Sequence, residues 1–132
     1  NTFIISSRID WSPYFKYIIE SAMADKEIAF DWCEGFEAGA VALTDINEQV
    51  AAKGTKEAIE DAKAKLASGE IKVFDTATFT VKGETLTTYL ADVDSDAAFT
   101  GDTEVVADGY FHESEYRSAP YFDLDIDGIT IK

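Results

Sequence analysis

The chain has 132 residues, which suits one domain, and its apolar fraction of 46% supplies enough core-forming side chains to argue against disorder. Its 26 acidic residues against 11 basic ones give a formal charge of -15, which argues against nucleic acids and anionic lipid surfaces as partners. The single cysteine, Cys33, cannot form an internal disulfide, and no apolar run approaches the ~20 residues that span a bilayer.

The first half of the sequence predicts strands that alternate with helices. Residues 2–5 are apolar and short enough for a strand. Ser12 and Pro13 predict a helix start, because serine caps helices and proline fits the first turn. Apolar residues then recur with helical spacing for about three turns. They are Tyr14, Ile18 and Ala22 on one face, with Phe15, Ile19 and Met23 beside them.

A second helix follows two short apolar runs at residues 28–32 and 40–43, the first of which we expect to be a strand. Thr55 is expected to cap this helix, which continues to Ala67 and ends at Ser68 and Gly69. Its buried stripe is formed by Ile59, Ala62 and Leu66. Residues 71–74 predict a further strand, and this order of elements predicts an α/β fold.

The second half is expected to be rich in strands. Residues 78–82, 84–90 and 104–107 contain many Thr, Val and Tyr, and residues 121–129 alternate apolar and acidic side chains as a half-buried strand does. The amino-acid composition changes near residue 75, but the residues there do not resemble a linker. We therefore predict a single domain over residues 1–132.

Few residues suggest catalysis or metal binding. One cysteine, Cys33, and one histidine, His112, could act as nucleophile and base, but no local signature surrounds them, so we interpret Cys33 as structural and His112 as a surface residue. Asp92, Asp94 and Asp96 resemble the start of a calcium loop. The pattern then fails, since alanine occupies position 98 and threonine position 103, and a solvated acidic loop is the favoured interpretation. We expect no cofactor, no metal site and no catalytic residues.

The candidate binding segment joins the first predicted strand to the first helix. In α/β sheets, ligands bind at the carboxyl ends of strands. There an arginine can donate two hydrogen bonds to a polar ligand, an aspartate can accept from hydroxyls, and a tryptophan can stack. The alternative is that Arg8 and Asp10 pair with each other while Trp11 packs against the helix. The candidate ligand-binding residues are Ser6, Ser7, Arg8, Asp10 and Trp11.

Four stretches together carry a family resemblance. They are a strand, Ser-Ser turn and Trp-Ser-Pro-Tyr-Phe helix start (4–15), the aromatic and glycine segment WCEGFEAGAVAL (32–43), a helix end, Ser-Gly and strand (66–74), and the tail (108–129). These stretches resemble the basic-membrane-protein (BMP) family of substrate-binding lipoproteins, relatives of purine-nucleoside receptors. They cover most of the chain, and each motif alone is moderately specific.

The resemblance implies a type I periplasmic-binding-protein fold, in which two α/β lobes close over a ligand. This chain would be the later part of the carboxy-terminal lobe. The implied role is that of an extracellular, non-catalytic, nucleoside-binding component of an ABC importer. It would work with an ABC permease and be lipid-anchored through an amino-terminal part absent from this sequence. Many relatives place a lysine shortly after the serine of the binding segment. Arg8 is the only nearby cation here, so the ligand need not be a purine nucleoside.

A different class of protein also fits the sequence. The strand-rich half could form a sheet that docks a partner, which would make the chain a standalone interaction or scaffold domain. Unpaired sheet edges would also allow a homodimer. No arrangement of residues in the sequence supports an enzyme.

Overall fold

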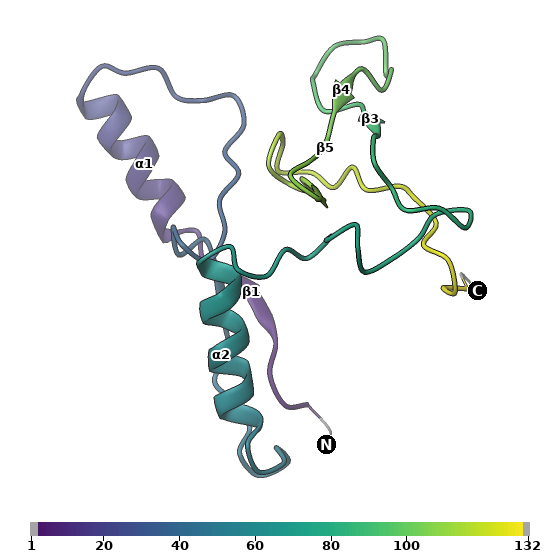
Figure 1. The fold of residues 1–132 in the computed structure, drawn as a ribbon. Helices are drawn as coiled ribbons and strands as arrows, with labels where there is room; N and C mark the ends of the chain where they lie inside the picture. Colours follow the sequence, from purple (N-terminus) through teal and green to yellow (C-terminus); the bar gives the residue numbers. More distant parts are fainter. Residues whose placement is uncertain (1–2, 131–132) are drawn as a thin grey trace. The chain divides into compact units, whose positions relative to one another are not determined.

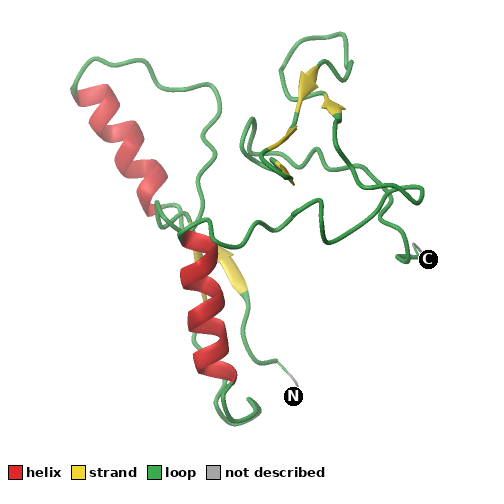
Figure 2. Cartoon of the chain, viewed as in Figure 1, coloured by secondary structure: helices red, strands yellow, loops and turns green. Residues whose placement is uncertain are grey.

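The computed structural model describes residues 3–130 and divides into two compact units, one ending at Ile71 and the other beginning at Lys72 (Figure 1). The boundary lies close to the change of composition near residue 75. Helices and strands are both present, and the described strands form three separate two-stranded antiparallel sheets (Figure 2). The α/β class and the single domain stay predictions.

The first unit contains one strand pair. Strands β1 (Ser7–Ile9) and β2 (Val41–Leu43) run antiparallel, with Arg8 opposite Ala42. The strand predicted over residues 2–5 is therefore misplaced: Thr2 lies outside the described residues, and 3–6 are not a strand. The amide of Asn47 donates to the carbonyl of Ile4 at 2.8 Å, but no ladder continues there. Residues 28–32, also predicted as a strand, form a loop because no other strand pairs with them.

Helix α1 (Ser12–Met23) begins at Ser12, as the sequence predicts, and follows β1 after two residues. Pro13 lies in its first turn, but Ser12 is not the capping side chain. The carboxylate of Asp10 instead accepts a hydrogen bond from the backbone amide of Ser12 at 3.0 Å. The helix packs through Tyr14 and Tyr17, whose rings lie 5.3 and 6.3 Å from that of Trp32.

Helix α2 (Thr55–Ala67) confirms the second predicted helix. Gly54 occupies its N-cap position with a left-handed φ of 88°, so Thr55 does not cap it. The predicted stripe of Ile59, Ala62 and Leu66 is partly buried, whereas most of the other helix residues are exposed. The backbone amide of Ser68 bonds to the carbonyl of Ala64 at 2.9 Å, where the sequence places the helix end.

The second unit is mostly loop with very short strands (Figure 2). Strands β3 (Leu90–Ala91) and β4 (Thr103–Glu104) pair antiparallel, as do β5 (Val106–Ala107) and β6 (Tyr110–Phe111). The strands predicted over residues 71–74 and 121–129 are wrong. Those predicted over 78–82 and 84–90 are reduced to a bridge between Val81 and Glu84 and to Leu90, the first residue of β3. The strand predicted over 104–107 is divided between β4 and β5. β-propensity cannot form a strand where no neighbouring backbone completes the ladder.

The core of the second unit surrounds Phe111, whose side chain is 1% exposed. Phe74 and Phe122 stack at 4.4 Å between ring centroids, and both contact the Phe111 ring edge-on. The other buried members of this cluster are Ala91, Val105, Val106 and Tyr121. In the tail, Phe122, Leu124 and Ile126 are partly buried while the aspartates between them are exposed, so the predicted alternation of burial is correct even without a strand.

Across residues 3–130, neither helix combines the length and the apolarity needed to span a membrane.

Candidate functional site

The segment from Ser6 to Trp11 is anchored by its backbone and leaves its side chains accessible. Ser6 exchanges hydrogen bonds with Thr44: its amide donates to the Thr44 hydroxyl at 3.0 Å, and its carbonyl accepts from the Thr44 amide at 2.9 Å. The amide of Asp10 donates to the carbonyl of Ala40 at 2.8 Å. Ser6, Ser7, Arg8 and Trp11 are exposed and Asp10 is half-buried.

Arg8 and Asp10 form an ion pair. An Nη1 atom of Arg8 lies 3.3 Å from Oδ2 of Asp10, and the two side chains are 52% and 30% exposed. Hydrogen bonds from Ser12 are the main cause that lowers the pKa of the Asp10 carboxyl below its ordinary value, and Arg8 adds to it. This is the pairing that the alternative interpretation of the sequence proposed. At this exposure a solute could still replace water around both groups.

Asp10 also lines a shallow hollow of about 550 Å³ between α1 and the glycine turn before β2. Lys16 and Glu20 stand on its helical side with 3.8 Å between their charged atoms. The other lining residues are Ser12, Pro13, Tyr17, Ala38 and Gly39. Sequence reasoning missed Lys16. Its position four residues after Ser12 places it on the same helix face, which could have identified it.

Trp11 packs on the helix and yet presents much of its ring to solvent. Its ring meets Tyr14 edge-on at 6.0 Å and Phe15 at 6.4 Å between centroids. The same side chain is 57% exposed. Trp11 therefore begins an exposed apolar stripe on α1 that repeats every four residues, hereafter the α1 stripe: Trp11, Phe15, Ile19 and Met23.

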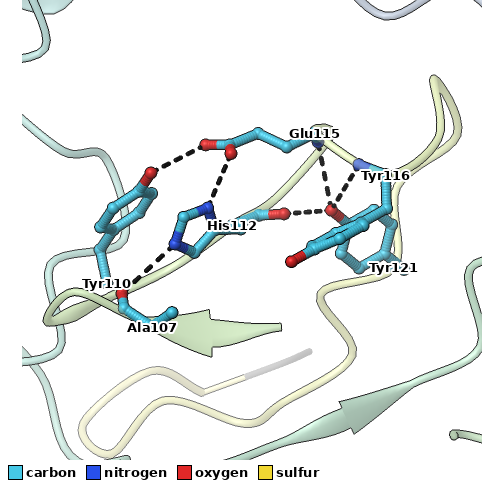
Figure 3. A network of polar contacts seen from close by, with 6 residues as sticks. All are labelled: Ala107, Tyr110, His112, Glu115, Tyr116 and Tyr121. Atoms are coloured by element: carbon cyan, nitrogen blue, oxygen red, sulfur yellow. Dashed lines mark hydrogen bonds and ion pairs between the residues drawn. The ribbon is translucent and has the colours of Figure 1, made fainter. Parts of the chain in front are cut away.

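A polar network surrounds His112 in the second unit (Figure 3). Nδ1 of His112 lies 2.7 Å from a carboxylate oxygen of Glu115, and Nε2 lies 3.3 Å from the carbonyl of Ala107. The imidazole stacks on Tyr110 at 3.8 Å, and the Tyr110 hydroxyl donates to Glu115 at 3.2 Å. The Tyr121 hydroxyl donates to the carbonyl of His112.

This network corrects the expectation that His112 lies on the surface. Its side chain is only 12% exposed, because Tyr110 and Glu115 enclose the ring. Both ring nitrogens face oxygen atoms of the chain itself. We infer that the network stabilises the packing of the β5–β6 hairpin against the turn that follows it. Cys33 belongs to the first unit and His112 to the second.

The carboxylates of the acidic loop accept hydrogen bonds from the backbone of the same loop. Asp94 accepts from the amide of Asp96 at 2.8 Å, and Asp96 accepts from the amide of Ala98 at 2.7 Å. Between residues 3 and 130, no three His, Cys, Asp or Glu side chains gather closely enough to hold a metal ion.

Comparison with known proteins adds no relative: no family model, curated protein or solved structure matches the chain.

Proposed function

We propose that this chain is the later part of the carboxy-terminal lobe of a BMP-family solute-binding protein, and that the whole protein is the extracellular, lipid-anchored component of an ABC importer. The proposal rests on the resemblance of residues 4–15, 32–43, 66–74 and 108–129 to that family. The role is to bind a solute and present it to the permease, and it involves no catalytic step.

The observation that carries the proposal is the position of the Arg8–Asp10 pair. The pair stands where β1 leads into α1, with Trp11 as the next residue. Both charged side chains are held by neighbours and remain accessible, so little ordering is needed before they contact a ligand. The hollow that Asp10 lines continues along the helix.

The chemistry of the segment favours an uncharged polar solute with a flat ring. The carboxylate of Asp10 accepts from hydroxyls, the guanidinium of Arg8 donates to carbonyl or ring acceptors, and the exposed face of Trp11 suits stacking. A nucleoside combines these groups. The formal charge of -15 on the chain disfavours the phosphorylated form of the same compound.

Calorimetry of the whole protein and of the 132-residue chain against a panel of nucleosides tests the proposal. We expect binding by the whole protein and none by the chain alone, because closure of a second lobe supplies part of the affinity. Equally tight binding by both would contradict the half-site, and the absence of any nucleoside binding by the whole protein would contradict the ligand class.

A protein-interaction domain is the second candidate, and the α1 stripe is the observation in its favour. Its four side chains are between 57% and 84% exposed in the described structure. A stripe of this kind is suited to burial against another protein surface or a second copy of the chain. Light scattering of the chain and of Phe15→Glu distinguishes the candidates: a dimer that the variant abolishes favours interaction, whereas two monomers favour the solute-binding role.

A further inference from the structure

A second pocket lies wholly within the second unit, apart from the segment discussed above. Its volume is about 390 Å³, within the range of pockets that hold small molecules. Charged groups of both signs and aromatic rings line it together. The lining residues on which the argument depends are Tyr89, Asp92, Phe99, Arg117, Tyr121 and Asp123.

Arg117 is the cation of this pocket, and its hydrogen bonding is incomplete. The side chain is partly buried, and its Nε is buried without an acceptor among the described residues. None of the described ion pairs includes it. A buried charged donor without a partner is costly. An acceptor from outside the chain that bonded to the other guanidinium nitrogens, where Arg117 lines the pocket, would stabilise the charge. A carboxylate fits the planar guanidinium best, because its two oxygens can accept two parallel hydrogen bonds.

Two carboxylates, from Asp92 and Asp123, line the same pocket without forming an ion pair with Arg117. Asp123 is held in position by the hydroxyl of Tyr89, which donates to it at 2.5 Å. Opposite charges that share a pocket without contacting each other leave room for a ligand that carries both charges. An ammonium group would face the carboxylates and a carboxylate group would face the guanidinium.

An apolar wall completes the pocket. Phe99 lines it, is 81% exposed, and has a left-handed φ of 50°, a backbone conformation that is costly for an aromatic residue. The backbone before it is fixed by the hydrogen bond from Ala98 to Asp96. An exposed ring held in this way offers a surface for an apolar side chain of a ligand.

We propose that the second unit binds a free α-amino acid with an apolar or aromatic side chain in the pocket between Asp92 and Arg117. The carboxylate of the amino acid bonds to Arg117, its ammonium group bonds to Asp92 and Asp123, and its side chain packs on Phe99. This site is independent of the nucleoside-binding proposal, because its residues all belong to the second unit.

The arginine Nε–Hε signals in an NMR titration test the site in the unaltered chain. The sequence has two arginines, so Arg8 serves as an internal control for Arg117. L-Phenylalanine should shift the Arg117 signal and leave that of Arg8 unchanged. An unchanged Arg117 signal at millimolar ligand would overturn the site.

Two analogues test the requirement for both charges. 3-Phenylpropionate lacks the ammonium group and phenethylamine lacks the carboxylate, and each should bind at least about tenfold more weakly than L-phenylalanine. Equal affinity for either analogue would overturn the assignment of a zwitterion.

Variants then assign the charges to residues. Arg117→Gln and Asp92→Asn should each weaken L-phenylalanine binding by at least about tenfold, whereas Lys53→Gln, at an exposed cation of the first unit, should not change it. Unchanged binding by Arg117→Gln would contradict the proposal. If that variant does not fold, the titration of the unaltered chain still decides between the outcomes.

Discussion

The carboxylate of Asp127 accepts a hydrogen bond from the backbone amide of Gly83, 44 residues earlier, at 2.7 Å. The same carboxylate accepts from the hydroxyl of Thr80 at 2.6 Å and from the amide of Lys82 at 3.1 Å. Lys82 and Gly83 have left-handed φ angles of 54° and 85°. One side chain of the tail therefore stabilises a turn near the start of the second unit.

This contact predicts a loss of stability in acid. The hydroxyl of Thr80 is the largest cause that lowers the pKa of Asp127. For Glu104, the largest cause is the hydroxyl of Thr88. Because the folded state lowers both pKa values, the stabilisation is present above the ordinary carboxyl range and is lost as the pH falls through the lowered values. Urea unfolding followed at about pH 7 and about pH 3 should show this loss.

Asp127→Asn should lower the urea midpoint at about pH 7 and reduce its decrease toward about pH 3. The control is Asp125→Asn, two residues earlier in the same exposed series, which should leave both values unchanged. A pH dependence in Asp127→Asn equal to that of the unaltered chain would show that the turn contact is not its source.

Phe111→Ala should be the most damaging core substitution in the second unit. The ring is 1% exposed and contacts four other aromatic rings, so truncation loses its burial and leaves a cavity. We expect a loss of about 3–5 kcal/mol in the free energy of unfolding, measured by denaturant titration. Phe30→Ala, at a side chain that is 92% exposed, should change it by no more than about 0.5 kcal/mol. Similar losses in the two variants would contradict the described core.

Gly101 is predicted to tolerate no side chain. A Cβ atom placed there would lie 2.4 Å from the carbonyl oxygen of Leu90, at the start of the β3–β4 pair. Gly101→Ala must therefore separate the two segments, and amide exchange of residues 90–104 should accelerate. Gly35→Ala is the matched control, because a Cβ there meets nothing within 4 Å. Slow exchange retained in Gly101→Ala would argue against this strand pairing.

The sequence predicts the parts of the fold that depend on neighbours along the chain. The stripe of Ile59 and Leu66 identifies α2, and the alternation from Phe122 to Ile126 gives the correct pattern of burial. Strands were predicted poorly, since a strand needs a partner that local composition does not specify. Ser7 and Leu43, for example, pair across β1 and β2 although they lie far apart in the sequence.

In the candidate sites, too, contacts between sequence neighbours could be predicted and contacts between distant residues could not. Arg8 and Asp10 are two residues apart, so their pairing could be considered from the sequence alone. The unpaired state of Arg117 could not, because it depends on which side chains fail to reach the guanidinium. The enclosure of His112 likewise requires the hairpin that brings Ala107 and Tyr110 beside it.

The most direct test of the solute-binding account is calorimetry of the whole protein with substitutions in the segment after β1. Against the nucleoside that binds best, Asp10→Asn and Arg8→Gln should each weaken affinity by about tenfold or more, because each removes a charged hydrogen-bonding group. Asp25→Asn, at an exposed residue beyond α1, should bind as the unaltered protein does. Unaltered affinity in both Asp10→Asn and Arg8→Gln would contradict the account.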